Sequence, residues 1–108
     1  MQLENLFHFS RLPGISQQEI FETLCASKTM RIERIISTGQ TTPANTWLAQ
    51  PENEWVMLLQ GKAQMEFVDG KTIHLQPGDY LNIPSGTKHR VSYTSSDPHC
   101  IWLAIHYT

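Results

Sequence analysis

The sequence predicts an all-β protein, an antiparallel sandwich or barrel preceded by a short N-terminal helix. Two observations favour this fold class. Short apolar and β-branched runs recur from residue 30 to the end of the chain, and glycine or proline turns separate neighbouring runs. Short strands at such close spacing are typical of antiparallel all-β architectures. We therefore expect one domain, with residues 1–29 as an N-terminal segment and residues 30–108 as the barrel.

The composition limits the classes of partner. The net charge is -2 and the isoelectric point is near 6.2, without a cluster of Lys and Arg, which argues against a nucleic-acid partner. No window approaches the roughly 20 apolar residues of a membrane span, and the first residues lack the pattern of a signal peptide. We expect a cytoplasmic protein that binds a small molecule, with no nucleic acid and no membrane contact.

The two cysteines, Cys25 and Cys100, are far apart in the sequence and have no metal or redox spacing. Neither a disulfide framework nor a zinc ribbon is indicated, because both need more cysteines at closer spacing. We expect both to be buried thiols. A chain of 108 residues is long enough to form a single hydrophobic core without disulfide bonds or a structural metal.

The N-terminal segment contains an apolar lead-in and a helical pattern. Residues 1–15 are rich in Leu and Phe and close on a Pro-Gly turn signal. Ser16 and Glu19 have the spacing of a capping box, which predicts a helix over residues 17–27. Its apolar side chains recur at helical spacing and form one stripe. These side chains are Ile20, Phe21, Leu24 and Cys25.

From residue 30 onward the chain reads as strands joined by turns. The strongest hairpin signal is Asp69-Gly70, because both residues tolerate the positive φ of a type I′ turn. The predicted extended segments span residues 30–37, 46–50, 54–60, 63–68, 71–75, 80–83, 89–94 and 100–107.

The strand that begins at Glu54 is apolar on both faces. Its alternate residues are Glu54, Val56 and Leu58 on one face and Trp55, Met57 and Leu59 on the other. A small barrel has only one interior, so the outer face needs a cover. Trp55 and Met57 are suitable residues for a contact between subunits, which predicts a homodimer. The alternative is that residues 1–27 cover this face within one chain.

Two motifs in this part of the chain resemble those of the cupin superfamily, and in particular small single-domain bacterial cupins of the "cupin 2" type, known mainly by fold. The resemblance covers residues 44–107 and implies a double-stranded β-helix, the cupin jelly-roll barrel. The matched positions are Glu54 and Gly61 of an E-x6-G pattern, then Gly78, Pro84, Gly86 and His89 of G-x5-P-x-G-x2-H, with Tyr93 where the family has an asparagine.

The resemblance also implies a divalent metal, Fe, Mn, Ni or Zn, inside the barrel. The first motif departs from the family at its two histidines. Their places fall on Trp47 and Ala49, or on Leu48 and Gln50, depending on the spacing before the glutamate. Two of the four usual ligands are therefore missing, although Gln50 could offer an amide oxygen.

Glu54 and His89 are the central candidates for a metal site. A carboxylate at the inward start of a strand is costly to bury without a partner, and a neutral imidazole or a metal would remove that cost. The alternative is a structural ion pair that remains from a former site. His106 would complete a set of two imidazoles and one carboxylate if it points inward, as in non-haem iron sites. Both faces of its strand are apolar, so the pattern leaves its direction open.

Aromatic residues near these positions could hold a flat or apolar part of a ligand. The candidates are Trp47, Tyr93 and Trp102. The alternative is that they are ordinary core residues.

Three functions fit the pattern: a metal-dependent enzyme of unknown substrate, a small-ligand-binding or sensing module without turnover, and a metal-free structural dimer. Missing histidines in the first motif count against strong metal binding. Glu54 and His89 in a strand-rich interior favour the first two functions over the third. The pattern predicts a small-molecule site with a candidate divalent metal, assigns no catalytic residue, and does not decide whether the protein is an enzyme.

Overall fold

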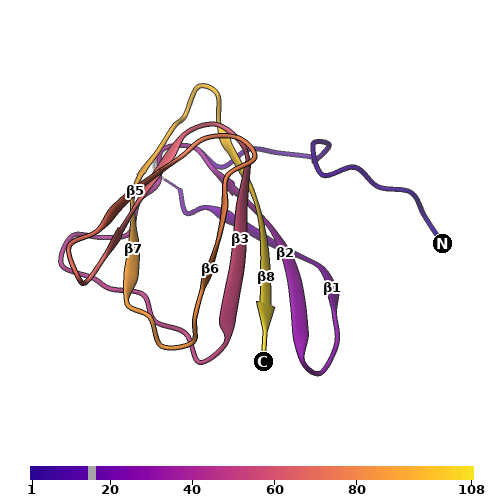
Figure 1. The fold of residues 1–108 in the computed structure, drawn as a ribbon. Helices are drawn as coiled ribbons and strands as arrows, with labels where there is room; N and C mark the ends of the chain where they lie inside the picture. The colour runs from indigo at the N-terminus through magenta and orange to yellow at the C-terminus, as the bar shows by residue number, and fades with distance from the viewer. Residues whose placement is uncertain (15–16) are drawn as a thin grey trace.

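A computed structural model describes residues 1–14 and 17–108. Its strands form two antiparallel sheets that face each other (Figure 1), which confirms the predicted all-β fold. The larger sheet has the order β1-β2-β8-β3-β6 and the smaller has the order β5-β4-β7. The strands are β1 (Ile20–Ala26), β2 (Met30–Ser37), β3 (Asn53–Gln60), β4 (Ala63–Phe67), β5 (Thr72–Leu75), β6 (Tyr80–Ile83), β7 (His89–Thr94) and β8 (Cys100–Tyr107).

The core lies between the two sheets. The register pairs Val56 with Ala104 and Leu58 with Trp102, so the inward face of β3 continues directly into β8. Met65 of β4 and Leu75 of β5 meet this face from the smaller sheet. Directly paired residues in an antiparallel ladder point to the same side of the sheet. The fully apolar part of the barrel interior therefore lies against the middle of β3 and β8.

The helix predicted over residues 17–27 is wrong, and no helix occurs among residues 1–14 and 17–108. The segment instead forms β1, whose Phe21 lies opposite Ile35 of β2. Pairing satisfies the backbone groups that β2 would otherwise expose along its edge, and it outweighs a weak local preference for helix. Ser16, the start of the expected capping box, lies outside the described residues.

The two cysteines differ in their surroundings. Cys100 is buried, as predicted, whereas Cys25 is exposed. A register shift between Thr23 and Cys25 interrupts the alternation of β1 close to its end, at the edge of the larger sheet. The prediction that both thiols are buried is therefore wrong for Cys25, which lies in the exposed last part of β1.

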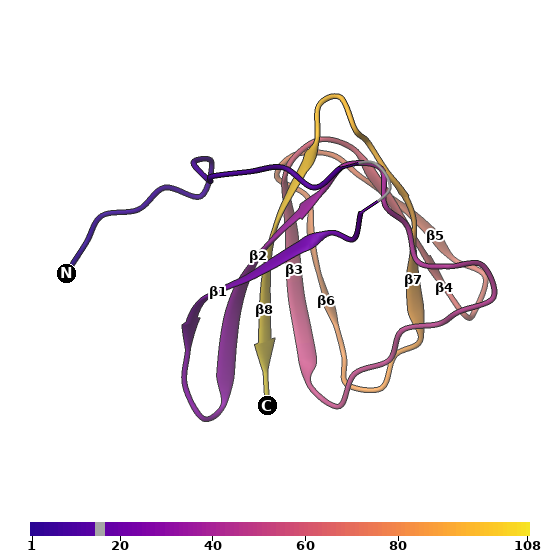
Figure 2. The ribbon, with the colours of Figure 1, turned by 180° about the vertical axis from the view of Figure 1, so that it is seen from behind.

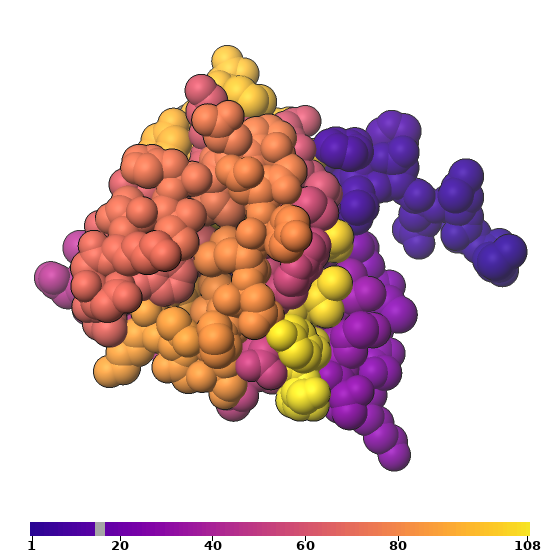
Figure 3. Space-filling model, in the orientation of Figure 1, coloured from indigo at the N-terminus to yellow at the C-terminus, as the bar shows by residue number. Residues whose placement is uncertain are grey.

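The segment before β1 crosses the outer side of the larger sheet (Figure 2). Arg34 of β2 holds it there, because Nη1 donates to the carbonyl oxygens of Asn5, Leu6 and His8 at 3.3, 3.1 and 3.2 Å. The same guanidinium forms two hydrogen bonds with the carboxylate of Glu22. Residues before this anchor project from the body of the molecule (Figure 3).

Two smaller expectations differ from the structure. Residues 46–50 form no strand, and Leu48 alone makes an isolated bridge to His89. The hairpin at Asp69-Gly70 is present, but only Gly70 has a positive φ, at 94°. Its N–H donates to the carbonyl of Phe67, so the turn is not of type I′. No helix in the described part of the chain is long and apolar enough to cross a membrane.

Candidate functional site

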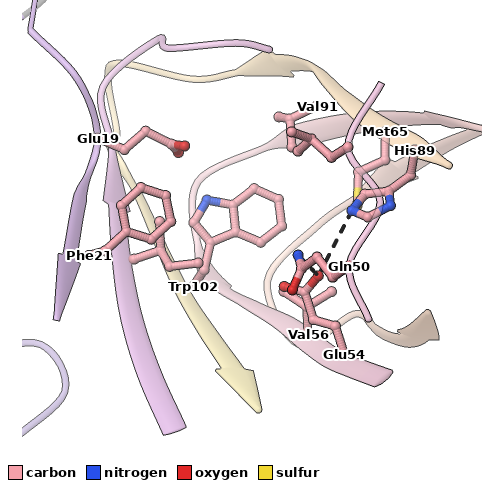
Figure 4. Close-up of a pocket in the computed structure, with 11 residues that line it drawn as sticks. Glu19, Phe21, Gln50, Glu54, Val56, Met65, His89, Val91 and Trp102 are labelled. Carbon is pink, nitrogen blue, oxygen red and sulfur yellow. Dashed lines mark hydrogen bonds and ion pairs between the residues drawn. The ribbon is translucent and has the colours of Figure 1, made fainter. Parts of the chain in front are cut away.

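Glu54 and His89 meet inside the barrel near the start of β3 (Figure 4). The distance between Glu54 Oε1 and His89 Nε2 is 3.9 Å, and both side chains are buried. Gln50 Nε2 donates to the same carboxylate oxygen at 3.3 Å. His89 Nδ1 lies 2.9 Å from the carbonyl oxygen of Thr87. A carbonyl only accepts hydrogen bonds, so Nδ1 carries a proton and Nε2 is the ring nitrogen that faces Glu54.

The second motif builds the loop that presents His89. Thr87 N–H donates to the carbonyl of Pro84 across a tight turn, and Gly86 within it has φ 77°. Gly86 N–H donates to the carbonyl of Gln50 at 2.8 Å. The turn glycine therefore ties the histidine loop to the segment that carries the amide beside Glu54.

Burial determines the electrostatics of Glu54. Desolvation is the largest influence and raises the pKa of this carboxyl above its ordinary value. The charges of His106 and His89 oppose the rise, as does the hydrogen bond from Gln50, whereas Glu33 adds to it. A carboxyl in this setting accepts a proton more readily than one in water.

His106 points inward, which answers a question that the sequence left open. It is 4% exposed and lies directly opposite Glu54 in the register of β3 and β8. Its Nε2 is 3.0 Å from Glu33 Oε1, and Arg31 Nε in turn donates to Glu33. Nδ1 of His106 is buried without a hydrogen-bond partner in the described structure. His106 thus belongs to a neighbouring polar network of β2 and β8.

A cavity of about 100 Å³ begins at the Glu54 and His89 pair. It exceeds the roughly 15 Å³ that one water needs and is smaller than the roughly 300 Å³ of a drug-sized pocket. Trp102 lines it, whereas Trp47 and Tyr93 are 40% and 49% exposed and are not among its lining residues. The lining consists of Glu19, Phe21, Ile35, Leu48, Gln50, Glu54, Val56, Met65, His89, Val91 and Trp102.

Glu19 is a polar residue of this cavity that sequence reasoning missed. Ser37 Oγ donates to Glu19 Oε2, and Trp102 Nε1 donates to Ser37 Oγ at 3.2 Å. Burial raises the pKa of Glu19, and the hydrogen bond from Ser37 opposes the rise. The sequence pattern assigned Glu19 to a capping box, and no local signal could have placed it otherwise. Only the pairing of β1 with β2 brings it beside Ser37.

The residues do not make a preformed metal centre. Glu54 and His89 supply two donors, but the Gln50 amide presents its N–H₂ to Glu54, and Nε2 of His106 is engaged by Glu33. Among residues 1–14 and 17–108, no group of three or more His, Cys, Asp or Glu is placed to hold a metal ion. Protein metal sites with open positions generally have three protein ligands. This donor set therefore falls short of such a centre.

A family model described as a cupin domain matches residues 35–106, more than half of the 108-residue chain. The chain belongs to the cupin family. No curated protein matches this cupin.

Solved structures agree with the family. This cupin is similar to a Ralstonia eutropha JMP134 protein named a "putative mannose-6-phosphate isomerase", with 37% identity, a TM-score of 0.89, and coverage of 99% of this chain and 98% of that one. A cupin superfamily protein from Desulfitobacterium hafniense DCB-2 has 23% identity and a TM-score of 0.71 over 99% and 98% of the two chains. A DMSP lyase from Ruegeria pomeroyi DSS-3 has 18% identity and a TM-score of 0.72 over 85% and 48%. The last two show the shared fold alone.

Proposed function

We propose that this cupin binds a small molecule in the cavity between its sheets, and that Glu54 and His89 recognise a polar group of that molecule. The observation that carries the proposal is the convergence of a carboxyl and an imidazole at one end of an otherwise largely apolar cavity of about 100 Å³. Sites for small molecules commonly combine apolar walls with a few convergent polar groups.

The pair can both donate and accept a hydrogen bond. The pKa of Glu54 is raised by burial, and His89 is oriented by the carbonyl of Thr87. With Nδ1 carrying the ring proton, Nε2 of His89 can accept a hydrogen bond from a ligand, and a protonated Glu54 carboxyl can donate one to a ligand oxygen. We infer recognition of a hydroxyl, carbonyl or amide group, with binding as the primary activity and no assigned turnover.

The charge of the lining argues against a sugar-phosphate substrate of the kind named for the Ralstonia protein. The residues that line the cavity include Glu19 and Glu54 but no Lys or Arg. A phosphate group needs cationic or multiple N–H donors to replace its hydration. We therefore do not extend that name to this cupin.

A metal-dependent enzyme is the competing hypothesis, and elemental analysis tests it. We expect protein purified without an affinity tag to contain well under one equivalent of Fe, Mn, Ni or Zn, because the pair lacks a third protein ligand. Near-stoichiometric metal in the parent that disappears in both Glu54→Ala and His89→Ala would contradict the metal-independent proposal and establish a metal centre.

Fragment binding followed by NMR tests the small-molecule proposal. The indole N–H of Trp102 reports on the cavity, while those of Trp47 and Trp55 report on other surfaces. We expect hydroxyl- or amide-bearing fragments to shift the Trp102 signal, and His89→Ala to weaken their binding by about tenfold, the effect of about 1.4 kcal/mol from one charge-assisted hydrogen bond. The exposed His74→Ala is the matched control. Equal binding by His89→Ala and the parent would refute the assigned role.

We also propose that the outer face of the larger sheet forms a homodimer contact. Trp55 and Met57 are only partly buried there, and the Trp55 ring lies 5.3 Å from that of Tyr80, which is 65% exposed. Aromatic and Met side chains are enriched at subunit interfaces. The chain covers another part of the same face with residues 5–9, through Arg34.

A further inference from the structure

Glu19 is a partly buried carboxyl with no cationic partner in the described part of the chain. It accepts a hydrogen bond from Ser37 Oγ. None of the ion pairs among the described residues includes Glu19. A carboxylate withdrawn from water is costly unless a positive charge or several donors replace its hydration. One hydroxyl replaces only a small part of that hydration. The Glu19 carboxylate can therefore accept a further hydrogen bond from a donor group in the cavity.

The position of Glu19 is held by a directed chain of hydrogen bonds. Trp102 Nε1–H donates to Ser37 Oγ, so the hydroxyl oxygen is already an acceptor and its single proton is directed at Glu19. Ser37 is fully buried and Trp102 is 4% exposed, so neither member is free to move with solvent. The chain therefore fixes both the carboxylate and the indole plane at the wall of the cavity.

The indole of Trp102 separates Glu19 from the Glu54 and His89 pair. In Figure 4 it lies between Glu19 at one end and His89 and Glu54 at the other, and the ring of Phe21 lies beside Glu19. The face of an aromatic ring attracts a cation, and the attraction increases when the cation is desolvated. With two carboxyls and no Lys or Arg in the lining, the electrostatic potential of the cavity favours a positive ligand over a negative one.

We propose that Glu19 is a specificity-determining residue, and that the cavity selects a small organic cation, a protonated amine. Its ammonium group pairs with Glu19, and its apolar body lies against Trp102 and Phe21. A second polar group, where the ligand has one, reaches the Glu54 and His89 pair. The inference rests on the proposed function, because it assumes that the cavity binds a small molecule.

Three probes of similar size and different charge test the inference: butylammonium, 1-butanol and butyrate. Each is titrated at about pH 8, where an alkylamine is still protonated, and the Trp102 indole N–H is followed by NMR. We expect butylammonium to bind about tenfold more tightly than 1-butanol, and butyrate to bind more weakly than either.

Glu19→Gln is expected to remove the preference for butylammonium over 1-butanol while retaining the hydrogen bond from Ser37, because an amide oxygen also accepts. Glu4→Gln is the matched control, since it removes the same charge from an exposed residue outside the cavity. Its preference should equal that of the parent.

The possible failures are distinguishable. Equal binding of 1-butanol and butylammonium by the parent would overturn the cation selectivity and leave small-molecule binding standing. A preference for butylammonium that persists in Glu19→Gln would overturn the role of Glu19. If no probe shifts the Trp102 signal, both this inference and the proposed function are wrong.

Discussion

Glu54 combines two properties that conflict in a folded protein, a charged group and a buried position. The residue is 8% exposed, and burial raises the pKa of its carboxyl despite the opposing effects of His106, His89 and Gln50. The folded protein therefore binds the proton of Glu54 more tightly than the unfolded chain does. The ionised carboxyl therefore lowers the free energy of unfolding at neutral pH, and groups with shifted pKa values of this kind are common at ligand-binding sites.

The pH dependence of stability follows from this sign. A raised folded-state pKa contributes stability that is fully present below the unfolded value and is lost as the pH rises through the folded value. We expect Glu54→Gln to unfold at higher urea concentration than the parent at pH values above the raised pKa. The advantage should shrink as the pH falls through the raised pKa of Glu54 and be gone near 4.5, the ordinary pKa of a glutamate carboxyl.

Urea unfolding of both proteins across this range measures the effect, with the exposed Glu4→Gln as the control for a lost surface charge. A stability difference that stays constant with pH would show that the pKa of Glu54 is not raised by burial.

Gly61 shows how one turn joins β3, β4 and β8. Its φ is 92°, and a Cβ at this position would lie 2.8 Å from both Cys100 Sγ and Ser95 Oγ. Gly70, in the turn between β4 and β5, has φ 94° and no atom within 4 Å of the same position. Both glycines need the left-handed backbone region, but only Gly61 is also required by close packing.

The two alanine variants separate these requirements. We expect Gly70→Ala to destabilise by about 1–2 kcal/mol, the strain of a non-glycine residue in the left-handed region. Gly61→Ala should cost that amount plus about 1–3 kcal/mol of overpacking. Chemical denaturation measures both, and equal losses in the two variants would contradict the role of packing at Gly61.

The N-terminal segment is attached to the larger sheet chiefly through Arg34. This side chain gives three hydrogen bonds to backbone carbonyls of residues 5–8, lies 5.4 Å from the ring centroid of Phe9, and pairs with Glu22. The guanidinium is suited to this role because its five N–H donors lie in one rigid plane. The segment therefore depends on a β2 side chain rather than on a strand pairing of its own.

Arg34→Met keeps most of the apolar stem and removes the donors. We expect amide hydrogen exchange in residues 5–9 to increase by at least tenfold, while the amides of β3 and β8 remain protected. Arg11→Met, at an exposed position, is the control. Unchanged exchange in the segment would mean that other contacts hold it.

The whole molecule is a barrel with one interior and an apolar outer face that its own chain covers only in part. Residues 5–9 lie over the β2 part of that face, whereas Trp55 and Met57 of β3 remain partly exposed. Apolar surface of this kind is typical of a contact with a second subunit. The same architecture separates the cavity from this face by the thickness of the sheet.

The proposed homodimer is tested by light scattering after size-exclusion chromatography. We expect the parent to have twice the 12.4 kDa chain mass and Trp55→Glu to be a monomer, because a charge would be desolvated at the contact. Val68→Glu replaces an exposed apolar residue beyond β4 and should stay dimeric. A monomeric parent at micromolar concentration would refute the dimer.

Most of the fold could be read from local patterns. From Met30 onward the predicted strands match β2 to β8 closely, apart from residues 46–50, because alternating β-branched residues and glycine or proline turns act locally, without reference to distant parts of the chain. The two motifs likewise identified the cupin barrel and placed Glu54 on its inward face. These features depend on the order of residues within one strand and its turns.

Long-range pairing decided the remaining features. Residues 20–26 have apolar positions compatible with either helix or strand, and the free edge of β2 selects the strand. The same pairing places Glu19 beside Ser37, and the register of β8 against β3 turns His106 inward. None of these contacts lies within one segment, and a one-residue change of register would reverse the facing of each strand. The polar groups of the cavity are therefore set by tertiary contacts that no local pattern encodes.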